Sequence, residues 1–259
     1  MGGHRPCIAI GLLVGAVMSC ETVPYTGRSQ LQLLSPEQEG QMGIQAYQQI
    51  LGKAQLAADP IGSEMVKRVG GRIAAVTGHS EYQWEYRLIK DDRQVNAFAL
   101  PGGKVAVYTG MLPVTRDDNG LAAVLGHEIG HVIARHGGER LSQQMLVSAG
   151  LETTMAALSR GNPATVQAVG FLLGAGASVG VLLPWSRKQE SEADHLGLIL
   201  MAKAGYDPRA ALDLWVRMAE LSRGGARPPE FLSTHPAEAT RIRQIEAWLP
   251  EANQYYKPR

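Results

Sequence analysis

The order of periodic segments in this chain of 259 residues predicts an α+β fold that is mostly helical. Helical patterns fill the first part of the chain, a block with the two-residue period of strands follows near residue 85, and helical patterns return after residue 117. Helices, a few strands and further helices are typical of an α+β domain. With 45% hydrophobic and 19% charged residues, the chain has enough apolar material for one globular core.

The first 34 residues read as a leader and a tether. Residues 1–19 contain a short basic start and an apolar stretch too short to cross a bilayer comfortably, as in a secretory signal peptide. The stretch ends in Val17-Met18-Ser19-Cys20, which resembles the lipobox of bacterial lipoproteins, so Cys20 is predicted to carry a lipid. An ordinary secretory signal or an uncleaved anchor is the alternative. Residues 20–34 are small and polar and are expected to be a tether.

Two helices are predicted next. Ser35, Pro36 and Gln38 form the pattern of an N-cap, a first-turn proline and a capping box, so a helix should run from there to about residue 51. A second helix is expected over residues 60–76, ended by Gly78.

A change of period then indicates a small sheet. Residues 84–89 alternate as a strand does, and residues 96–100 and 104–108 read as two short strands around the turn Pro101-Gly102-Gly103.

The remaining chain is predicted to be helical. Asp117 or Asp118 can cap a long apolar helix, a charged helix covers residues 186–204, another starts at residue 207, and the last covers 236–250. These segments predict one domain over residues 35–250 and a tail over 251–259.

Residues 165–184 are rich in apolar and small side chains, and their length approaches that of a membrane span. No basic flank marks a topology, and the charged helix follows directly. A buried helix pair or a plug over a cleft is therefore favoured, and a membrane span stays open.

The segment His127-Glu128-Ile129-Gly130-His131 carries the chemistry of a metal site. Residues four apart lie on one face of a helix, so two imidazoles can reach one ion. Zinc takes nitrogen ligands and keeps a position for water in catalytic sites, and Glu128 can act as general base toward that water. The apolar flanks predict a buried helix, in which two histidines and a carboxylate are costly without a metal or partners. The sequence thus predicts one zinc ion per chain.

A third ligand is expected from the charged helix that follows. Glu190 and Asp194 lie four apart on one face, so Glu190 can bind the metal while Asp194 accepts the free N–H of a ligand histidine. Glu192 is rotated away from that face and is the weaker candidate.

Three stretches together resemble metallopeptidase family M48, the family of HtpX and the CAAX prenyl endopeptidases, and within it the periplasmic lipoprotein branch of BepA and LoiP. They are residues 96–103, the segment around His127, and residues 186–194. The resemblance implies a zincin-like fold with a small sheet beside the active-site helix. It also assigns the metal ligands and the catalytic glutamate, on the matching positions, to His127, His131, Glu190 and Glu128.

The same resemblance gives roles to two further segments. Asn96, Ala97 and Phe98 match an edge strand that pairs with an extended substrate, although Asn96 read alone is equally compatible with a turn residue. His235, in a segment that resembles one of the BepA-like branch, can approach the zinc and hold the site inactive, donate to the oxyanion, or simply cap a helix. Arg241 follows and can pair with a site carboxylate.

These features predict a zinc-dependent endopeptidase that hydrolyses misfolded proteins of the bacterial cell envelope. The predicted place is a periplasm-facing lipoprotein of the outer membrane, because Glu21 after Cys20 differs from the aspartate of inner-membrane retention. Partners would be polypeptide substrates, the membrane through the lipid, and the outer-membrane protein assembly machinery. The alternative is a lipoprotein chaperone with a latent zinc site. A net charge of +1 gives no reason to expect nucleic acid.

Overall fold

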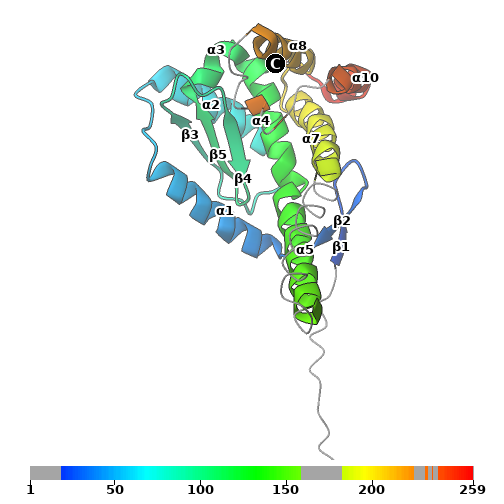
Figure 1. Cartoon of the computed structure of the whole chain (residues 1–259). Coiled ribbons are helices and arrows are strands. Elements are labelled where there is room, and N and C mark those ends of the chain that lie inside the picture. The colour runs from blue at the N-terminus through cyan, green and yellow to red at the C-terminus, as the bar shows by residue number, and fades with distance from the viewer. Residues whose placement is uncertain (1–18, 159–182, 225–230, 233–234, 236–238, 259) are drawn as a thin grey trace, which may run out of the picture.

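The computed structural model describes residues 19–158, 183–224, 231–232, 235 and 239–258. Its elements follow the predicted order of helices, a small sheet and helices (Figure 1), which confirms the α+β, mostly helical fold. The helices are α1 (Pro36–Leu51), α2 (Pro60–Ala74), α3 (Leu112–Thr115), α4 (Asp118–Ile133), α5 (His136–Leu158), α7 (Leu183–Lys203), α8 (Arg209–Gly224) and α10 (Ala239–Tyr255). The strands are β1 (Ser19–Thr22), β2 (Ser29–Gln32), β3 (Glu85–Ile89), β4 (Ala97–Leu100) and β5 (Lys104–Tyr108), and a 3-10 turn, η1 (Thr109–Met111), precedes α3.

Helix starts follow the capping chemistry of the sequence. Ser35 and Gln38 form both halves of a capping box at α1, with Pro36 in the first turn. Asp59 and Asp117 cap α2 and α4 by accepting from the backbone N–H three residues on. The predicted helix over 60–76 ends at Ala74, before the left-handed Gly78.

The three-stranded sheet has the order β3-β5-β4. β5 lies in the middle, parallel to β3 and antiparallel to β4, so β4 is an edge strand in the described chain. All three strands match the predicted ones to within a residue. Figure 1 shows β4 on the side of the sheet that faces α4.

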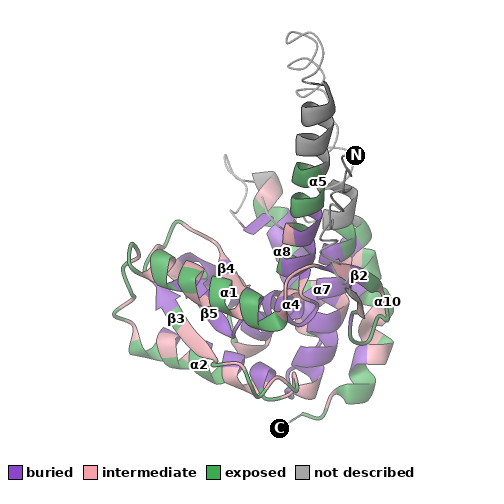
Figure 2. Ribbon diagram, turned by 90° about the horizontal axis from the view of Figure 1, so that it is seen from below, coloured by how far each residue is buried: buried purple, intermediate pink, exposed green. Residues whose placement is uncertain are grey.

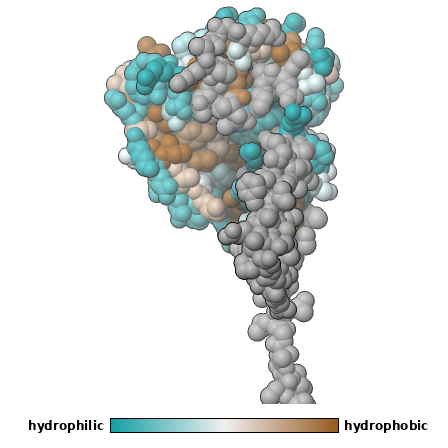
Figure 3. Space-filling model, in the orientation of Figure 1, coloured by the Kyte–Doolittle hydropathy of each residue, from teal (hydrophilic) through white to brown (hydrophobic). Residues whose placement is uncertain are grey.

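Successive side chains of a strand point to opposite faces of the sheet. Different helices cover these two faces. Val105 and Val107 join the main core with α2 and α4, whereas Ala106 packs with Tyr47 of α1. Apolar residues are visible on the face of the molecule shown in Figure 3, in the region of the sheet and α1. The partly buried Phe98 packs in the same cluster as Ala106 and Tyr47.

α4 and α7 form the centre of the molecule and are largely buried (Figure 2). Their backbones approach closely because α4 carries glycine where α7 crosses it. A Cβ added at Gly126 would lie 2.8 Å from the carbonyl oxygen of Gly197, and one at Gly130 would lie 2.9 Å from that of Ala193. This close packing brings the charged part of α7 next to the histidines of α4.

The segment predicted as a tether, residues 20–34, instead contains a β-hairpin. β1 and β2 pair antiparallel and lie beside α5 and α7 (Figure 1). Gln30 and Gln32 are only 4% and 3% exposed, although their polarity predicted a solvated chain. The prediction was wrong because polar side chains can be buried when they have partners, as Gln32 does in donating to the carbonyl of Arg135.

The last helix also departs from the predicted bounds. α10 runs through Pro250 to Tyr255, so most of the expected tail, residues 251–259, is helical. Ala252 is buried, and Glu251 pairs with His195 of α7 at 2.8 Å. Tertiary packing thus extends the helix beyond a residue that usually ends one.

Two predictions about membrane segments concern the rest of the chain. The signal peptide, residues 1–19, lies outside the described residues except for Ser19, and so does almost all of 165–184. Among the helices that the structure describes, none combines the length and apolar character that a bilayer span requires.

Candidate metal centre

Four side chains converge on one point between α4, α7 and the segment before α10. They belong to His127, His131, Glu190 and His235, and one nitrogen or oxygen atom of each lies within 4.8 Å of all the others. The Nε2 atoms of the two α4 histidines are 3.1 Å apart, because residues four apart share a face of the helix. His235 Nδ1 lies 3.1 Å from His127 Nε2 and 2.8 Å from the Glu190 carboxylate.

The spacing of these atoms fits a small tetrahedral cation. Nitrogen and oxygen ligands about 2.0–2.1 Å from zinc in a tetrahedron lie roughly 3.3–3.4 Å from one another. The Glu190 oxygens lie 3.4 Å from His127 Nε2 and 3.3 Å from His131 Nε2, close to this value. Three imidazoles and a carboxylate are also a ligand set that zinc favours.

On the side of His127, the second ring nitrogen faces the C-terminal helices. Its Nδ1 lies 2.9 Å from an Asp194 carboxylate oxygen, and the two Asp194 oxygens accept hydrogen bonds from Arg241 Nε and Nη2. The guanidinium carbon lies 3.5 Å from the centre of the Trp215 ring, so the charge is stacked as well as paired. Arg241 also lies 3.2 Å from Glu190.

On the side of His131, the second ring nitrogen meets another histidine. The Nδ1 atoms of His131 and His136 are 2.8 Å apart, and His136 Nε2 lies 3.0 Å from the carboxylate of Glu192. Arg28, from the loop between β1 and β2, donates to that carboxylate at 2.8 Å. A line of polar contacts therefore leads from His131 to the N-terminal hairpin.

Glu128 lies next to the cluster and is 4% exposed. Its carboxylate accepts a hydrogen bond from the backbone of Ala99 in β4. The Oε1 atom has no hydrogen-bond partner among the described residues, and His235 Nε2 is 3.4 Å from it. Burial raises the pKa of Glu128, so this carboxylate takes up a proton more readily than an exposed one.

Burial and neighbouring charges also shift the pKa values of the cluster. Burial and Arg241 favour neutral His127, but Asp194 and Glu190 outweigh them and raise its pKa to about 9. Burial lowers the pKa of His131 well below its usual range. Burial opposes ionisation of Glu190, yet three neighbouring histidines lower its pKa far below the usual range. The centre thus holds an ionised carboxylate among imidazoles, as a cation site requires.

The predicted substrate strand lies beside this centre. The Tyr108 N–H donates to the carbonyl of Asn96, which makes this a hydrogen-bonded pair of the antiparallel ladder. Because such pairs alternate, the backbone groups of Ala97 and Ala99 point away from β5. The Ala97 N–H is held by the side chain of Asn96 and the Ala99 N–H by Glu128. The carbonyls of both alanines point along the open edge of the sheet.

The model of Peptidase family M48 matches residues 60–249 of the chain. The chain belongs to this family. It is 41% identical to Mitochondrial metalloendopeptidase OMA1 of Schizosaccharomyces pombe over 235 residues, which is 90% of this chain and 67% of that protein. It is 29% identical to the Beta-barrel assembly-enhancing protease of Escherichia coli over 229 residues, 86% of this chain and 46% of that protein. Metalloendopeptidase OMA1 of Bos taurus is 32% identical over 250 residues, 90% of this chain and 46% of that protein.

The M48 match confirms the predicted family and the enzyme class, a metalloendopeptidase. The chain spans about half the length of two of these three relatives and 67% of the third, so activity, substrates and partners of the whole protein stay proposals.

The predicted location in the bacterial outer membrane is wrong. The relatives from Schizosaccharomyces pombe, Saccharomyces cerevisiae, Arabidopsis thaliana and Bos taurus are named mitochondrial enzymes. The lipoprotein, signal-peptide and periplasmic predictions receive no support either. They rested on a short apolar segment before Cys20, a pattern of low specificity, and the structure pairs Cys20 with Leu31 in the hairpin.

Within the M48 domain, sequence reasoning brought together His127, His131, Glu190, Glu128 and Asp194, which do lie together. It missed His136 and the role of Glu192, and Arg28 was read as part of a tether. The one available signal was the polar pair Arg135-His136 directly after the apolar helix.

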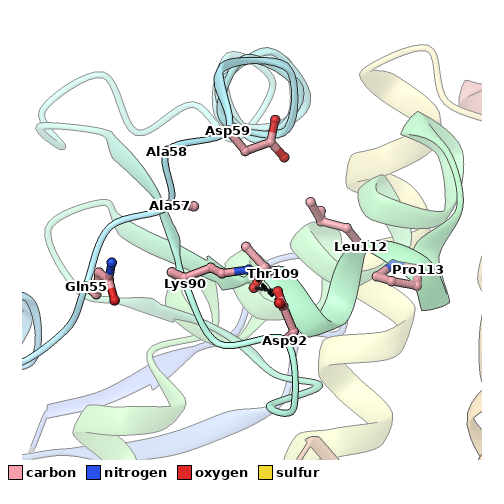
Figure 4. A pocket seen from close by; sticks show the side chains of 9 residues that line it. All are labelled: Gln55, Ala57, Ala58, Asp59, Lys90, Asp92, Thr109, Leu112 and Pro113. Atoms are coloured by element: carbon pink, nitrogen blue, oxygen red, sulfur yellow. Dashed lines mark hydrogen bonds and ion pairs between the residues drawn. The ribbon is translucent and has the colours of Figure 1, made fainter.

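The pocket shown in Figure 4 is separate from the metal centre. Its volume is about 410 Å³, and it is lined by residues before α2 and after β3 and β5. Lys90 pairs with Asp92, which also accepts from Thr109, so these polar groups already satisfy one another. None of its lining residues belongs to the metal cluster.

Proposed function

We propose that this protein is a zinc-dependent endopeptidase that cleaves polypeptides bound in extended form. The observation that carries the proposal is the convergence of His127, His131 and Glu190, whose ligand atoms lie within 4.8 Å of one another, with Glu128 and an open sheet edge beside them.

A zinc ion held by these side chains would supply Lewis acidity, polarising the scissile carbonyl and acidifying a water molecule. Glu128 is placed to take the proton of that water and later to pass it to the leaving amine. Two features support this role: the pKa of Glu128 is raised by burial, and its Oε1 has no hydrogen-bond partner among the described residues.

We further propose that the substrate adds to the sheet at β4. The carbonyls of Ala97 and Ala99 are free to accept from an extended peptide, and backbone pairing gives affinity without requiring one sequence. The hydrogen bond from Ala99 to Glu128 ties this strand to the catalytic helix, so a bound peptide would lie beside the general base.

His235 takes the fourth ligand position in this proposal. Its Nδ1 lies as close to the other ligand atoms as they do to one another, which favours a metal contact over a helix cap. A catalytic zinc needs that position for water, so His235 must move aside before cleavage.

The deciding experiment compares wild type with Glu128→Gln, with zinc content and cleavage of unfolded casein both measured. Wild type should bind one zinc per chain and cleave, whereas the variant should bind as much zinc and lose at least ~10³-fold in rate. A variant that keeps full activity would overturn the catalytic assignment. Zinc binding by both proteins without any cleavage would favour the chaperone with a latent site.

A second comparison tests His235. If it blocks the fourth position, His235→Ala should retain zinc through the other three ligands and cleave casein several-fold faster than wild type. A fall in kcat with unchanged zinc content would assign His235 to oxyanion stabilisation instead.

A further inference from the structure

The Nδ1 atom of His131, on the side of the ring away from the metal cluster, begins a chain of buried polar contacts. Metal binding through Nε2 of the same ring does not require these contacts. His131 Nδ1 lies 2.8 Å from His136 Nδ1, and His136 Nε2 lies 3.0 Å from a Glu192 oxygen. His136 and Glu192 are 2% and 7% exposed. A contact between two histidine nitrogens is favourable only if one carries a proton and the other does not.

The contact with Glu192 decides which nitrogen carries the proton. A carboxylate accepts only, so His136 must present a protonated Nε2 to it, and a neutral His136 then has a bare Nδ1. That bare Nδ1 accepts from a protonated His131 Nδ1, which leaves His131 Nε2 free to bind a metal. The direction of the whole chain is therefore fixed by the negative charge at its end.

Glu192 is in turn held by the hairpin loop. Arg28 donates to it through Nε at 2.8 Å, and the Thr26 hydroxyl donates to its other oxygen. Arg28 also forms a two-pronged pair with Glu139 of α5, at 2.7 and 2.8 Å. Glu192 therefore meets three hydrogen-bonding groups, those of His136, Thr26 and Arg28, and holds its place at the end of the chain of contacts.

We propose that His136, Glu192 and Arg28 form a positioning relay that fixes the tautomer and orientation of His131. Through Arg28, the N-terminal hairpin then helps to position a ligand of the metal centre. This inference rests on the proposed function, since it takes His131 as a ligand. Asp194 supports His127 by direct contact, and the relay supports the second histidine over two contacts.

The relay predicts which variants change zinc affinity. Measurements use the full chain with Glu128→Gln, so that zinc binding is followed without cleavage. Glu192→Leu removes the acceptor and should weaken zinc binding roughly 10- to 100-fold, and Arg28→Leu should weaken it less, because Glu192 keeps its contact with His136. Glu192→Gln keeps an oxygen toward His136 and should recover most of the affinity.

The matched control is Glu21→Leu. Glu21 is also a hairpin carboxylate paired with an arginine, Arg135, but it lies outside the relay. It should leave zinc affinity unchanged. The d–d absorption spectrum of the cobalt-substituted protein gives a second readout, and it should change in Glu192→Leu and not in Glu21→Leu.

A double-variant cycle separates positioning from general loss of packing. If Glu192 acts through His136, Glu192→Leu should cost no further zinc affinity in a His136→Leu background. Additive losses, or equal losses in Glu21→Leu, would overturn the relay while leaving the metal centre intact. Absence of zinc binding by the parent protein would instead count against the proposed function.

Circular dichroism and urea unfolding of the metal-free proteins identify variants that fail to fold. If Glu192→Leu is one of them, Arg28→Leu carries the test, and unchanged zinc affinity in that variant would overturn the relay.

Discussion

His127 and His131 lie one turn apart on α4, and each is supported through a carboxylate of α7 by an arginine from a different end of the chain. His127 is backed directly by Asp194 of α7 and, through it, by Arg241 of α10. His131 is backed by His136, and through it by Glu192 and the hairpin residue Arg28. The first support is short and ionic, whereas the second is longer and contains a neutral ring.

The difference has an energetic consequence. A direct carboxylate contact transmits a change in one step, and removing it also leaves a buried cation without its main partner. In the longer support each contact can relax a little. A substitution at its far end should therefore have a smaller effect on metal binding. The C-terminal support should therefore be the more sensitive of the two.

The largest expected effect comes from Asp194→Ala. The side chains of Asp194 and Arg241 are 2% and 5% exposed, so the variant leaves a buried guanidinium facing a cavity. We expect a loss of about 3–5 kcal/mol in the free energy of unfolding of the metal-free protein, measured in urea, together with weaker zinc binding. A loss smaller than that of Glu192→Gln at pH 7 would show that the C-terminal support is not the more sensitive of the two.

The next effect concerns pH on the N-terminal side. The pKa of Glu192 in the folded protein is about 2, below its ordinary 4.5, so its stabilising contribution is present above about pH 4.5 and disappears as the pH falls toward 2. The difference in unfolding free energy between wild type and Glu192→Gln should be about 2–3 kcal/mol near pH 7 and vanish near pH 2. Chelator in both samples removes the effect of metal release. A difference independent of pH would contradict the assigned ionisation.

A smaller effect is expected for Arg241→Lys. Lysine keeps the charge but cannot donate hydrogen bonds to both Asp194 oxygens and stack on Trp215 at the same time. We expect a loss of about 1–2 kcal/mol in unfolding free energy. Unchanged stability would mean that charge alone, and not the planar fork, supports His127.

The smallest effect is expected for Thr26→Val, which removes one hydrogen bond to Glu192 and preserves the shape of the side chain. The loss should be about 1 kcal/mol or less, and zinc affinity should change less than twofold because Arg28 remains. A loss as large as that of Glu192→Gln at pH 7 would place most of the hairpin contribution in the threonine.

Part of the site was predictable because it depends on local spacing. The pairs His127 with His131 and Glu190 with Asp194 follow from helical periodicity, and the caps at Ser35 and Asp117 follow from short-range hydrogen bonding. β4 was predictable as a strand, although its place at the sheet edge beside Glu128 appears only in the fold.

The hairpin shows what local reasoning could not supply. Gln32 and Arg28 have the composition of a solvated tether, and the groups that hold them in the folded protein are far away in the sequence. Their partners lie more than a hundred residues away, at Arg135, Glu139 and Glu192. Burial of such polar groups is unfavourable unless they make those contacts. The periodicity of the sequence does not predict contacts between segments so far apart.

By itself, the sequence determined the residues of the proposed metal site: two histidines, a glutamate and a second acidic pair, at spacings that place each pair on one face of a helix. The tertiary structure alone decided how that site is held, because glycines at 126 and 130 let α7 approach α4, and the chain folds its N-terminal hairpin and α10 onto either side. Ligand identity depends on one turn of helix, whereas ligand support depends on which distant segments share the interior.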